Sequence, residues 1–291
     1  MEALSVIQQA LNGLTFGAQL FLVASGFTLI FGLMRISNLA HGGFYVVGAY
    51  VGMVTVGATH NFWLALVAGA LAAAGVGVVV ELGLLRRVRN KEMPEVLVTV
   101  GVLFVITDLI VAIFGGDGKT LNPATGGAPS GALVIGDFRY PAYGIFVIGV
   151  TVVIGVVLFL LQRYSRVGAI VRAGVDDREM AAAMGIDIDK VFTGVFALGA
   201  LLAGVAGVIG AGRQSLTPYA GTEILLYGLV VVIIGGLGSI GGAAVGAVLL
   251  GLIDAFAKQY IPELSYFTIF APMVLVLIVR PQGLFGRVSV A

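Results

Sequence analysis

Long apolar stretches with very few charged residues dominate this sequence and restrict what it can fold into. Eight windows meet or approach the roughly 20 apolar residues that a helix needs to cross a bilayer. They are residues 11–33, 39–58, 62–85, 95–114, 142–161, 191–211, 224–257 and 266–279. Continuous runs favour helices over an outer-membrane barrel, whose strands show about ten residues of alternating hydrophobicity. The sequence therefore predicts an all-α fold, a polytopic transmembrane helical bundle.

The window at residues 224–257 is too long for one straight crossing. Residues 235–242 interrupt it with the sequence GGLGSIGG. Glycine breaks a membrane helix where the protein itself surrounds the exposed backbone. We expect two segments that meet at this break, which gives eight or nine crossings in total.

Composition agrees with one membrane domain over residues 1–291. Charged residues make up 11% of the chain, against about 25% in soluble domains, so the chain cannot cover itself with polar surface. The 44 glycines suit close helix packing in lipid. A net charge of +1 argues against a nucleic-acid partner, and the absence of cysteine excludes disulfides and thiol chemistry. Two histidines are too few for a histidine-rich metal site, and the first residues lack the basic start of a cleaved signal peptide.

Lysine and arginine counts predict the orientation, because short cytoplasmic loops carry an excess of both. Two loops and the end of the last window are basic, with Arg86, Arg87, Arg89, Lys91, Arg163, Arg166, Arg172, Arg178, Lys190, Arg280 and Arg287. The loop at 115–141 has Lys119 and Arg139 alone, and Arg213 is isolated in its loop. We expect the basic loops to be cytoplasmic and the N-terminal segment to lie outside, which requires nine crossings.

Residues 163–190 form the one sizeable polar segment that also carries folding signals. Asp176 with Glu179 three residues later is a capping-box pattern, and Gly185 stands where a short helix would end. The pattern predicts about two turns of helix over residues 177–184 on the cytoplasmic side.

The same short helix would carry a small apolar knob. Met180 and Met184 lie four residues apart and share a face, with Ala181 and Ala183 beside them. An apolar surface on the water-facing side of a membrane protein either binds a partner or packs back on its own chain. The residue pattern leaves both readings open.

Two stretches imitate nucleotide-binding motifs. Residues 118–120 read Gly-Lys-Thr like the end of a P-loop, but Ile113 stands where that loop needs glycine. Residues 236–241 fit G-x-G-x-x-G with Asp254 downstream, yet further apolar sequence follows where a soluble βαβ unit is required. The four-residue glycine spacing over 238–246 instead indicates helix packing in lipid.

A polar segment leads into the second window. Ser37 or Asn38 can cap the following helix, and Gly42 begins a series of glycines that makes this helix smooth enough for close packing or for a pathway. His41 is either polar lining of a conduit or a hydrogen-bonded packing histidine near the interface. Asp108 and Asp254 fall inside predicted spans, where a charge costs about 2.5–3.5 kcal/mol, so each should face the bundle or water and have a partner.

Several of these stretches together resemble the permease subunits of bacterial ABC importers for branched-chain amino acids. The resemblance covers nearly the whole chain in the same order and rests on residues 26–32 running into 36–42, on 235–243 and on 280–286. In that family a cytoplasmic segment docks on the ATPase. The matching residues here are Arg172, Asp176, Glu179, Met180, Ala181, Met184 and Gly185.

Membership would imply a mechanism and partners. An extracytoplasmic binding protein would deliver substrate, this chain and a second, longer permease would form the path, and two ATPase subunits would drive alternating access in the inner membrane. ATP and Mg²⁺ would be used by the ATPases, and this chain would bind no cofactor and catalyse no reaction. Path residues expected here are Asn38, His41, Gly42, Gly236, Gly238 and Ser239, since a broken helix's N-terminal end suits a substrate carboxylate.

The sequence leaves other substrates and other classes of membrane protein open. The resemblance extends to permeases for urea, short amides and other small solutes, and more distantly to sugar permeases. A stand-alone secondary transporter or channel is the alternative class, although the chain lacks the series of acidic or histidine residues expected of a proton relay. A membrane enzyme is disfavoured because no carboxylate, histidine or serine cluster has catalytic spacing.

Overall fold

The computed structural model describes residues 2–34, 38–89, 91–136, 138–176, 178–264 and 267–286, without the side chains of residues 2, 3, 33, 34, 135, 175, 176, 178 and 179. Its long apolar helices are α1 (Glu2–Met34), α2 (His41–Thr59), α3 (Phe62–Val80), α5 (Glu92–Phe114), α6 (Ala142–Tyr164), α9 (Ile188–Ala211) and α11 (Ile240–Tyr260). Two shorter apolar helices are α10 (Ala220–Gly235) and α12 (Phe267–Val279). The remaining elements are a π-helical turn (Glu81–Leu85), α4 (Arg86–Val88), α7 (Arg166–Asp176), α8 (Arg178–Ala183), two 3-10 turns (Pro123–Gly126 and Pro262–Leu264) and the antiparallel hairpin of β1 (Ala132–Ile135) and β2 (Phe138–Pro141).

Among the described residues, seven helices are long and apolar enough to cross a membrane, and α10 and α12 are shorter apolar helices. The predicted polytopic helical bundle is therefore confirmed. The predicted break is also present, since α10 ends at Gly235 and α11 begins at Ile240. Gly236 and Gly238 within the break have φ of 97° and 82°, a left-handed conformation that favours glycine.

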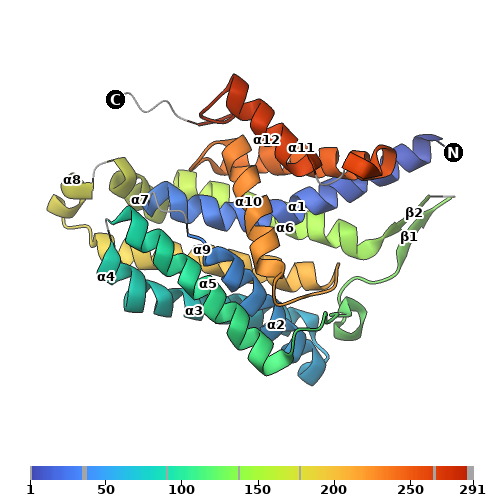
Figure 1. The fold of residues 1–291 in the computed structure, drawn as a ribbon, viewed down its shortest axis with the longest axis horizontal. Helices are drawn as coiled ribbons and strands as arrows, with labels where there is room; N and C mark the ends of the chain where they lie inside the picture. Colours follow the sequence, from blue (N-terminus) through green and yellow to red (C-terminus); the bar gives the residue numbers. More distant parts are fainter. Residues whose placement is uncertain are drawn as a thin grey trace.

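Helices α1 and α9 form the buried centre of the bundle (Figure 1). In α1, Leu22, Val23 and Ala24 are completely buried. The two helices approach closely where Gly26 meets Gly199, because a Cβ atom added to Gly26 would lie 2.6 Å from the Gly199 carbonyl oxygen. Such contacts need glycine on at least one helix.

Three further helices meet at one glycine contact. Gly48 of α2, Gly69 of α3 and Gly204 of α9 touch through their backbones, and a Cβ on Gly48 would lie 2.4 Å from the Gly204 Cα. A Cβ on Gly69 would lie 2.5 Å from the Gly48 carbonyl oxygen, and one on Gly204 would lie 2.8 Å from the Gly69 carbonyl oxygen. The three backbones touch directly at these glycines, so Gly48, one of the glycines that follow Gly42 in the second window, has a packing role.

The short elements rich in arginine gather at one end of the bundle. Figure 1 places α4, α7 and α8 together there, whereas the first turns of α1 and the β1–β2 hairpin lie at the other end. We call the first the basic end and the second the opposite end. This arrangement agrees with the grouping of loops expected from their lysine and arginine content.

Two helices depart from a simple up-and-down bundle. In Figure 1, α10 runs across α1 rather than alongside it, with Gly221 at its start against Gly42 of α2 and Gly235 at its end against Gly242 of α11. Helix α2 begins halfway along the bundle. Its first residue, His41, contacts Gly26 of α1, and Gly26 in turn packs against Gly199 in the middle of α9. The sequence left His41 as either conduit lining or a packing histidine near the interface, and the structure shows it buried against α1.

The three-glycine contact supplies a test of this packing. We expect Gly48→Ala to destabilise the protein by about 1–3 kcal/mol, since the added methyl group has to push two backbones apart. Gly75→Ala is the matched control, because Gly75 lies in α3 with nothing within 4 Å of its added Cβ. Thermal unfolding of the detergent-purified protein measures both. Equal unfolding temperatures for the two variants would contradict the packing described here.

Candidate functional site at the basic end

Helix α8 ends where the sequence predicted, and for the predicted reason. Gly185 has φ of 82°, and its N–H donates to the Ala182 carbonyl at 2.9 Å. The Ile186 N–H donates to the Ala181 carbonyl at 3.2 Å. This pair of bonds is a Schellman motif, which satisfies the last carbonyls of a helix and requires a left-handed residue that glycine supplies without strain.

The methionine knob is exposed. Met180 and Met184 are 60% and 77% accessible. Ala181 faces the other way and is buried in a small apolar cluster with Ile188, Phe192 and Val195 of α9. Ala181 is therefore the anchor of α8 rather than a member of its exposed surface, which corrects the expected grouping of Ala181 with the two methionines. The exposed surface is held on α9 and is not covered by the described part of the chain.

The preceding residues form a helix that the sequence did not predict. Helix α7 starts after Ser165, whose hydroxyl accepts the Gly168 N–H at 3.0 Å. Arg172 lies on α7 and donates a hydrogen bond to the Gln162 carbonyl near the end of α6. A cation is favourable at this position because the C-terminal end of a helix carries partial negative charge.

The predicted capping box falls at the junction of α7 and α8. Asp176 is the last residue of α7 rather than a residue preceding an isolated helix. The side chains of Asp176 and Glu179, and residue 177, lie outside the described residues. The bond between the two side chains stays a prediction.

A charged network beside α8 joins the end of α3 to the start of α9. Glu81 opens the π-helical turn and is completely buried, and its carboxylate pairs with Arg89. Arg89 also forms an ion pair with Asp189, and Asp189 forms a second ion pair with Arg86 at 2.8 Å. The Thr193 hydroxyl donates to Glu81 at 2.7 Å. The carboxylate thus has both an ionic and a hydrogen-bonding partner, which a buried charge requires.

This network contacts the anchor of α8. The Arg89 guanidinium lies 4.7 Å from the centre of the Phe192 ring, a cation–π contact, and Phe192 belongs to the apolar cluster that buries Ala181. Single π-helical turns inside α-helices occur frequently at functional sites. The sequence contained one indication of this network. Glu81 lies near the end of an apolar window, where a carboxylate needs a partner.

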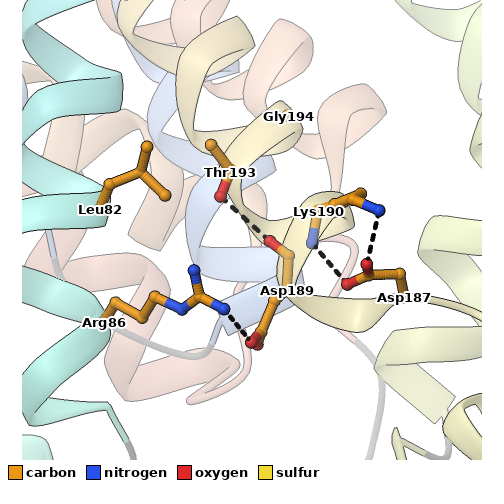
Figure 2. A pocket seen from close by; sticks show the side chains of 7 residues that line it. All are labelled: Leu82, Arg86, Asp187, Asp189, Lys190, Thr193 and Gly194. Carbon is orange, nitrogen blue, oxygen red and sulfur yellow. Dashed lines mark hydrogen bonds and ion pairs between the residues drawn. The ribbon is translucent and has the colours of Figure 1, made fainter.

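An open pocket of about 300 Å³ lies between these elements. Figure 2 shows its lining: Leu82, Arg86, Asp187, Asp189, Lys190, Thr193 and Gly194. Asp187 caps α9 by accepting the Lys190 N–H at 3.2 Å, and the Lys190 ammonium pairs with it at 2.9 Å. The side-chain bond from Lys190 lowers the pKa of Asp187. Two cations and two carboxylates balance one another in the lining.

The residues predicted to line a path are placed in two groups. Asn38 and His41 are buried, and His41 Nε2 is 3.0 Å from the Val23 carbonyl oxygen. Gly42 packs so closely that an added Cβ would lie 2.1 Å from the Gly221 carbonyl oxygen. Their path role stays a prediction, and in this structure they are packing residues.

The second group forms the break between α10 and α11. Its members are Gly236, Gly238 and Ser239, and the Ser239 hydroxyl caps α11 by accepting the Gly242 N–H at 3.0 Å. The segment after α12 covers this break, since Leu284 and Phe285 donate their N–H groups to the Ile234 and Gly235 carbonyls. Two separate stretches that carried the family resemblance therefore meet here. The role of this break in a path stays a prediction.

The acidic residues predicted inside spans have different surroundings. Asp254 is buried, with Lys258 at 2.7 Å and Thr268 at 3.4 Å. Asp108 is exposed on α5 and has no hydrogen-bond or ion-pair partner among the described residues. Asp108 therefore does not face its own bundle, which was one of the two surroundings expected for it, and the expected partner is not among the described residues of this chain. Among the described residues, no group of three or more histidine, cysteine or carboxylate residues could hold a metal ion.

Comparisons with known proteins agree with this architecture. The family model for the branched-chain amino acid transport system permease component matches residues 9–277. The chain is 31% identical to the high-affinity branched-chain amino acid transport system permease protein LivH of Escherichia coli (strain K12), over 99% of this chain and 98% of that protein. It is 25% identical to the fructose import permease protein FruF of Bifidobacterium longum (strain NCC 2705), over 81% of this chain and 66% of that protein. The solved structure of PsaBC from Streptococcus pneumoniae in complex with Fab shares the fold, with a TM-score of 0.51, 13% identity and coverage of 94% and 92% of the two chains.

The Glu81–Arg89 pair supplies a test of the network. We expect Arg89→Gln to destabilise the purified protein by about 3 kcal/mol, because it leaves a buried carboxylate without its cation. Replacing Glu81 and Arg89 together by glutamine should restore most of the loss. Arg87→Gln is the control, since Arg87 is exposed at the same end. The unfolding temperature of each variant is the measurement. An Arg89→Gln variant as stable as the wild type would show that the pair has no structural role.

Proposed function

This chain belongs to the family of branched-chain amino acid transport system permease components, and on that premise we propose that it forms half of the membrane path of an importer for branched-chain or related amino acids. It is a multi-pass membrane protein and a permease component of an ATP-driven importer, and it is not itself an enzyme. The proposal adds the substrate, the partners and the inner membrane of a bacterium as the location. It also places the basic end of the bundle in the cytoplasm.

The exposed methionine knob is the observation that carries the proposal. Met180 and Met184 project from a helix whose other side is anchored on α9, so a force applied to the knob is transmitted to a central helix. Methionine is flexible and suits protein–protein contacts. An ATPase subunit that grips α8 would therefore move α9 and bias the bundle between two packings.

A second permease chain is supported by Asp108. This carboxylate lies six residues, or about 9 Å, before the end of α5 and faces away from its own bundle. A charge at that depth is unfavourable in lipid and needs a polar partner. A second permease subunit against this face of α5 would supply that partner. The two permeases would enclose the path between them.

Amino acids are the substrate class that the similarities support best. The match to LivH covers both proteins almost completely, whereas the match to FruF covers 66% of the fructose permease at lower identity. Sugar import is the second candidate because of that weaker similarity. Selection would be shared with the extracytoplasmic binding protein, which delivers substrate to the end opposite the basic end.

Reconstitution tests the function directly. The chain is co-expressed with its candidate ATPases and second permease, purified in mild detergent and placed in vesicles with the binding protein. We expect ATP-dependent uptake of labelled leucine and none of fructose. Uptake that persists without ATP, from a chain that retains no ATPase, would favour a stand-alone transporter. ATP-driven uptake of fructose alone would leave the importer class intact and overturn the substrate.

The knob makes a specific prediction. We expect replacement of Met180 and Met184 by glutamate to weaken ATPase association about tenfold or more, because two charges would have to be desolvated in the interface. Met93→Glu is the control, since Met93 is 75% accessible at the start of α5 at the same end of the bundle. Co-purification yield and ATP-dependent uptake are the measurements. Wild-type association of the double variant would place the ATPase contact elsewhere.

Asp108 makes a separate prediction about pairing. We expect Asp108→Leu to reduce the recovery of the permease pair in size-exclusion chromatography, since removing one partner of a buried polar contact costs about 2–5 kcal/mol. Asp117→Leu is the control, because Asp117 is an exposed carboxylate in the loop after α5. An Asp108→Leu chain that pairs as well as the control would remove this face of α5 from the interface.

A further inference from the structure

A polar cluster lies at the end of the bundle opposite the basic end, and none of its residues was expected in the path. Its members are Gln19 of α1, Tyr45 of α2, Arg213 and Gln214 of the loop after α9, and Glu223 of α10. Gln19 and Tyr45 are each 1% accessible. Polar side chains buried at this depth in a membrane protein are costly to retain without a function.

Hydrogen bonds link the cluster across three elements. Arg213 Nη1 donates to Gln19 Oε1 at 3.3 Å, and Gln19 Nε2 donates to the Tyr45 hydroxyl at 3.3 Å. Because a guanidinium is a donor alone, it fixes the amide of Gln19 with its oxygen toward Arg213. The cluster is thus an ordered arrangement of groups with fixed directions.

A glycine makes room for these groups. A Cβ atom on Gly210 would lie 2.0 Å from the Tyr45 hydroxyl and 2.6 Å from Gln19 Nε2. Glycine at this position of α9 lets the tyrosine hydroxyl and the amide approach the helix backbone. The last turns of α9 are therefore built around the cluster.

The two charges of the cluster do not neutralise each other. Within the part of the chain that the structure describes, Arg213 forms no ion pair with Glu223 or with any other carboxylate. Glu223 accepts a hydrogen bond from Tyr227 at 2.8 Å. Both charged side chains are exposed. Glu223 stands two residues after Gly221, which packs against Gly42 and Val46 beside Tyr45 in α2. A cation and an anion near one buried hydroxyl give this region one positive and one negative group.

We propose that Gln19, Tyr45, Arg213 and Glu223 form an outward-facing subsite that receives the two charges of a zwitterionic α-amino acid. The Arg213 guanidinium takes the carboxylate, for which its planar fork is suited, and the Glu223 carboxylate takes the ammonium group. The Tyr45 hydroxyl supplies a further hydrogen-bonding group. Leu226 is 46% accessible one turn after Glu223 and offers apolar contact to an aliphatic side chain.

This inference rests on the proposed function and makes it more specific. A neutral sugar has no charges for Arg213 and Glu223 to bind, so the subsite favours amino acids over sugars. It also assigns part of the selection to the permease in addition to the binding protein. Arg213 and Glu223 could instead serve to dock the binding protein. That alternative predicts a different experimental result.

The experiment uses the complete transporter in vesicles with saturating binding protein. We expect Arg213→Gln and Glu223→Gln each to lower the maximal rate of labelled leucine uptake roughly tenfold or more, as for loss of a charged hydrogen bond. Arg213→Lys keeps the positive charge but lacks the planar guanidinium with its paired donors, so this variant should have an intermediate uptake rate. Arg139→Gln is the matched control, because Arg139 is an exposed arginine of β2 at the same end. It should transport at the wild-type rate.

The affinity of the binding protein for each transporter separates the alternatives. An unchanged Kd with a lowered maximal rate supports the subsite. A weaker Kd with a normal maximal rate, or wild-type uptake by both glutamine variants, overturns it. Failure of the wild-type transporter to carry leucine would instead overturn the proposed substrate class, so the two failures are distinguishable.

Discussion

Close backbone contact between helices is the constraint on which the rest of this structure depends. In lipid, burying an apolar side chain between helices gains little, because the lipid is equally apolar, and tight packing has to come from small residues. The contact of Gly48, Gly69 and Gly204 brings three helices to van der Waals distance, and Gly26 with Gly199 does the same for the two central helices. The high glycine content of the chain is therefore a structural requirement as well as a composition signal.

The same contacts allow irregular backbone inside the bundle. A broken helix is tolerated in a membrane protein where the surrounding protein satisfies its free backbone groups. At the break after α10, the segment that follows α12 supplies this satisfaction through Leu284 and Phe285. Helix α10 then runs across α1 (Figure 1). Discontinuous helices of this kind form the substrate sites of many transporter folds.

Sequence reasoning recovered the parts that depend on local composition. The apolar windows, the break at residues 235–242 and the stop at Gly185 follow from run length and from the left-handed conformation that glycine permits. The charged network and the polar cluster were missed because most of their partners are far apart in the chain. In the network Glu81 and Thr193 are separated by 112 residues, and in the cluster Gln19 and Arg213 are separated by 194. The contact of His41 with Val23 of α1 could not be predicted, because no local pattern encodes where the start of α2 packs on α1.

Helix α9 connects the two ends of the molecule and gives the proposed functions a common mechanical element. Its first turns carry Phe192 and Thr193, which contact the anchor of α8 and the charged network, and its last turns carry Gly210 beside the polar cluster. The helix has 24 residues and is about 36 Å long, close to the thickness of a bilayer. Since α9 is among the most buried helices, it cannot shift at one end without repacking at the other. Movement imposed through α8 would therefore change the distance between Tyr45 and Arg213. The affinity of the proposed subsite for an amino acid would change with that distance.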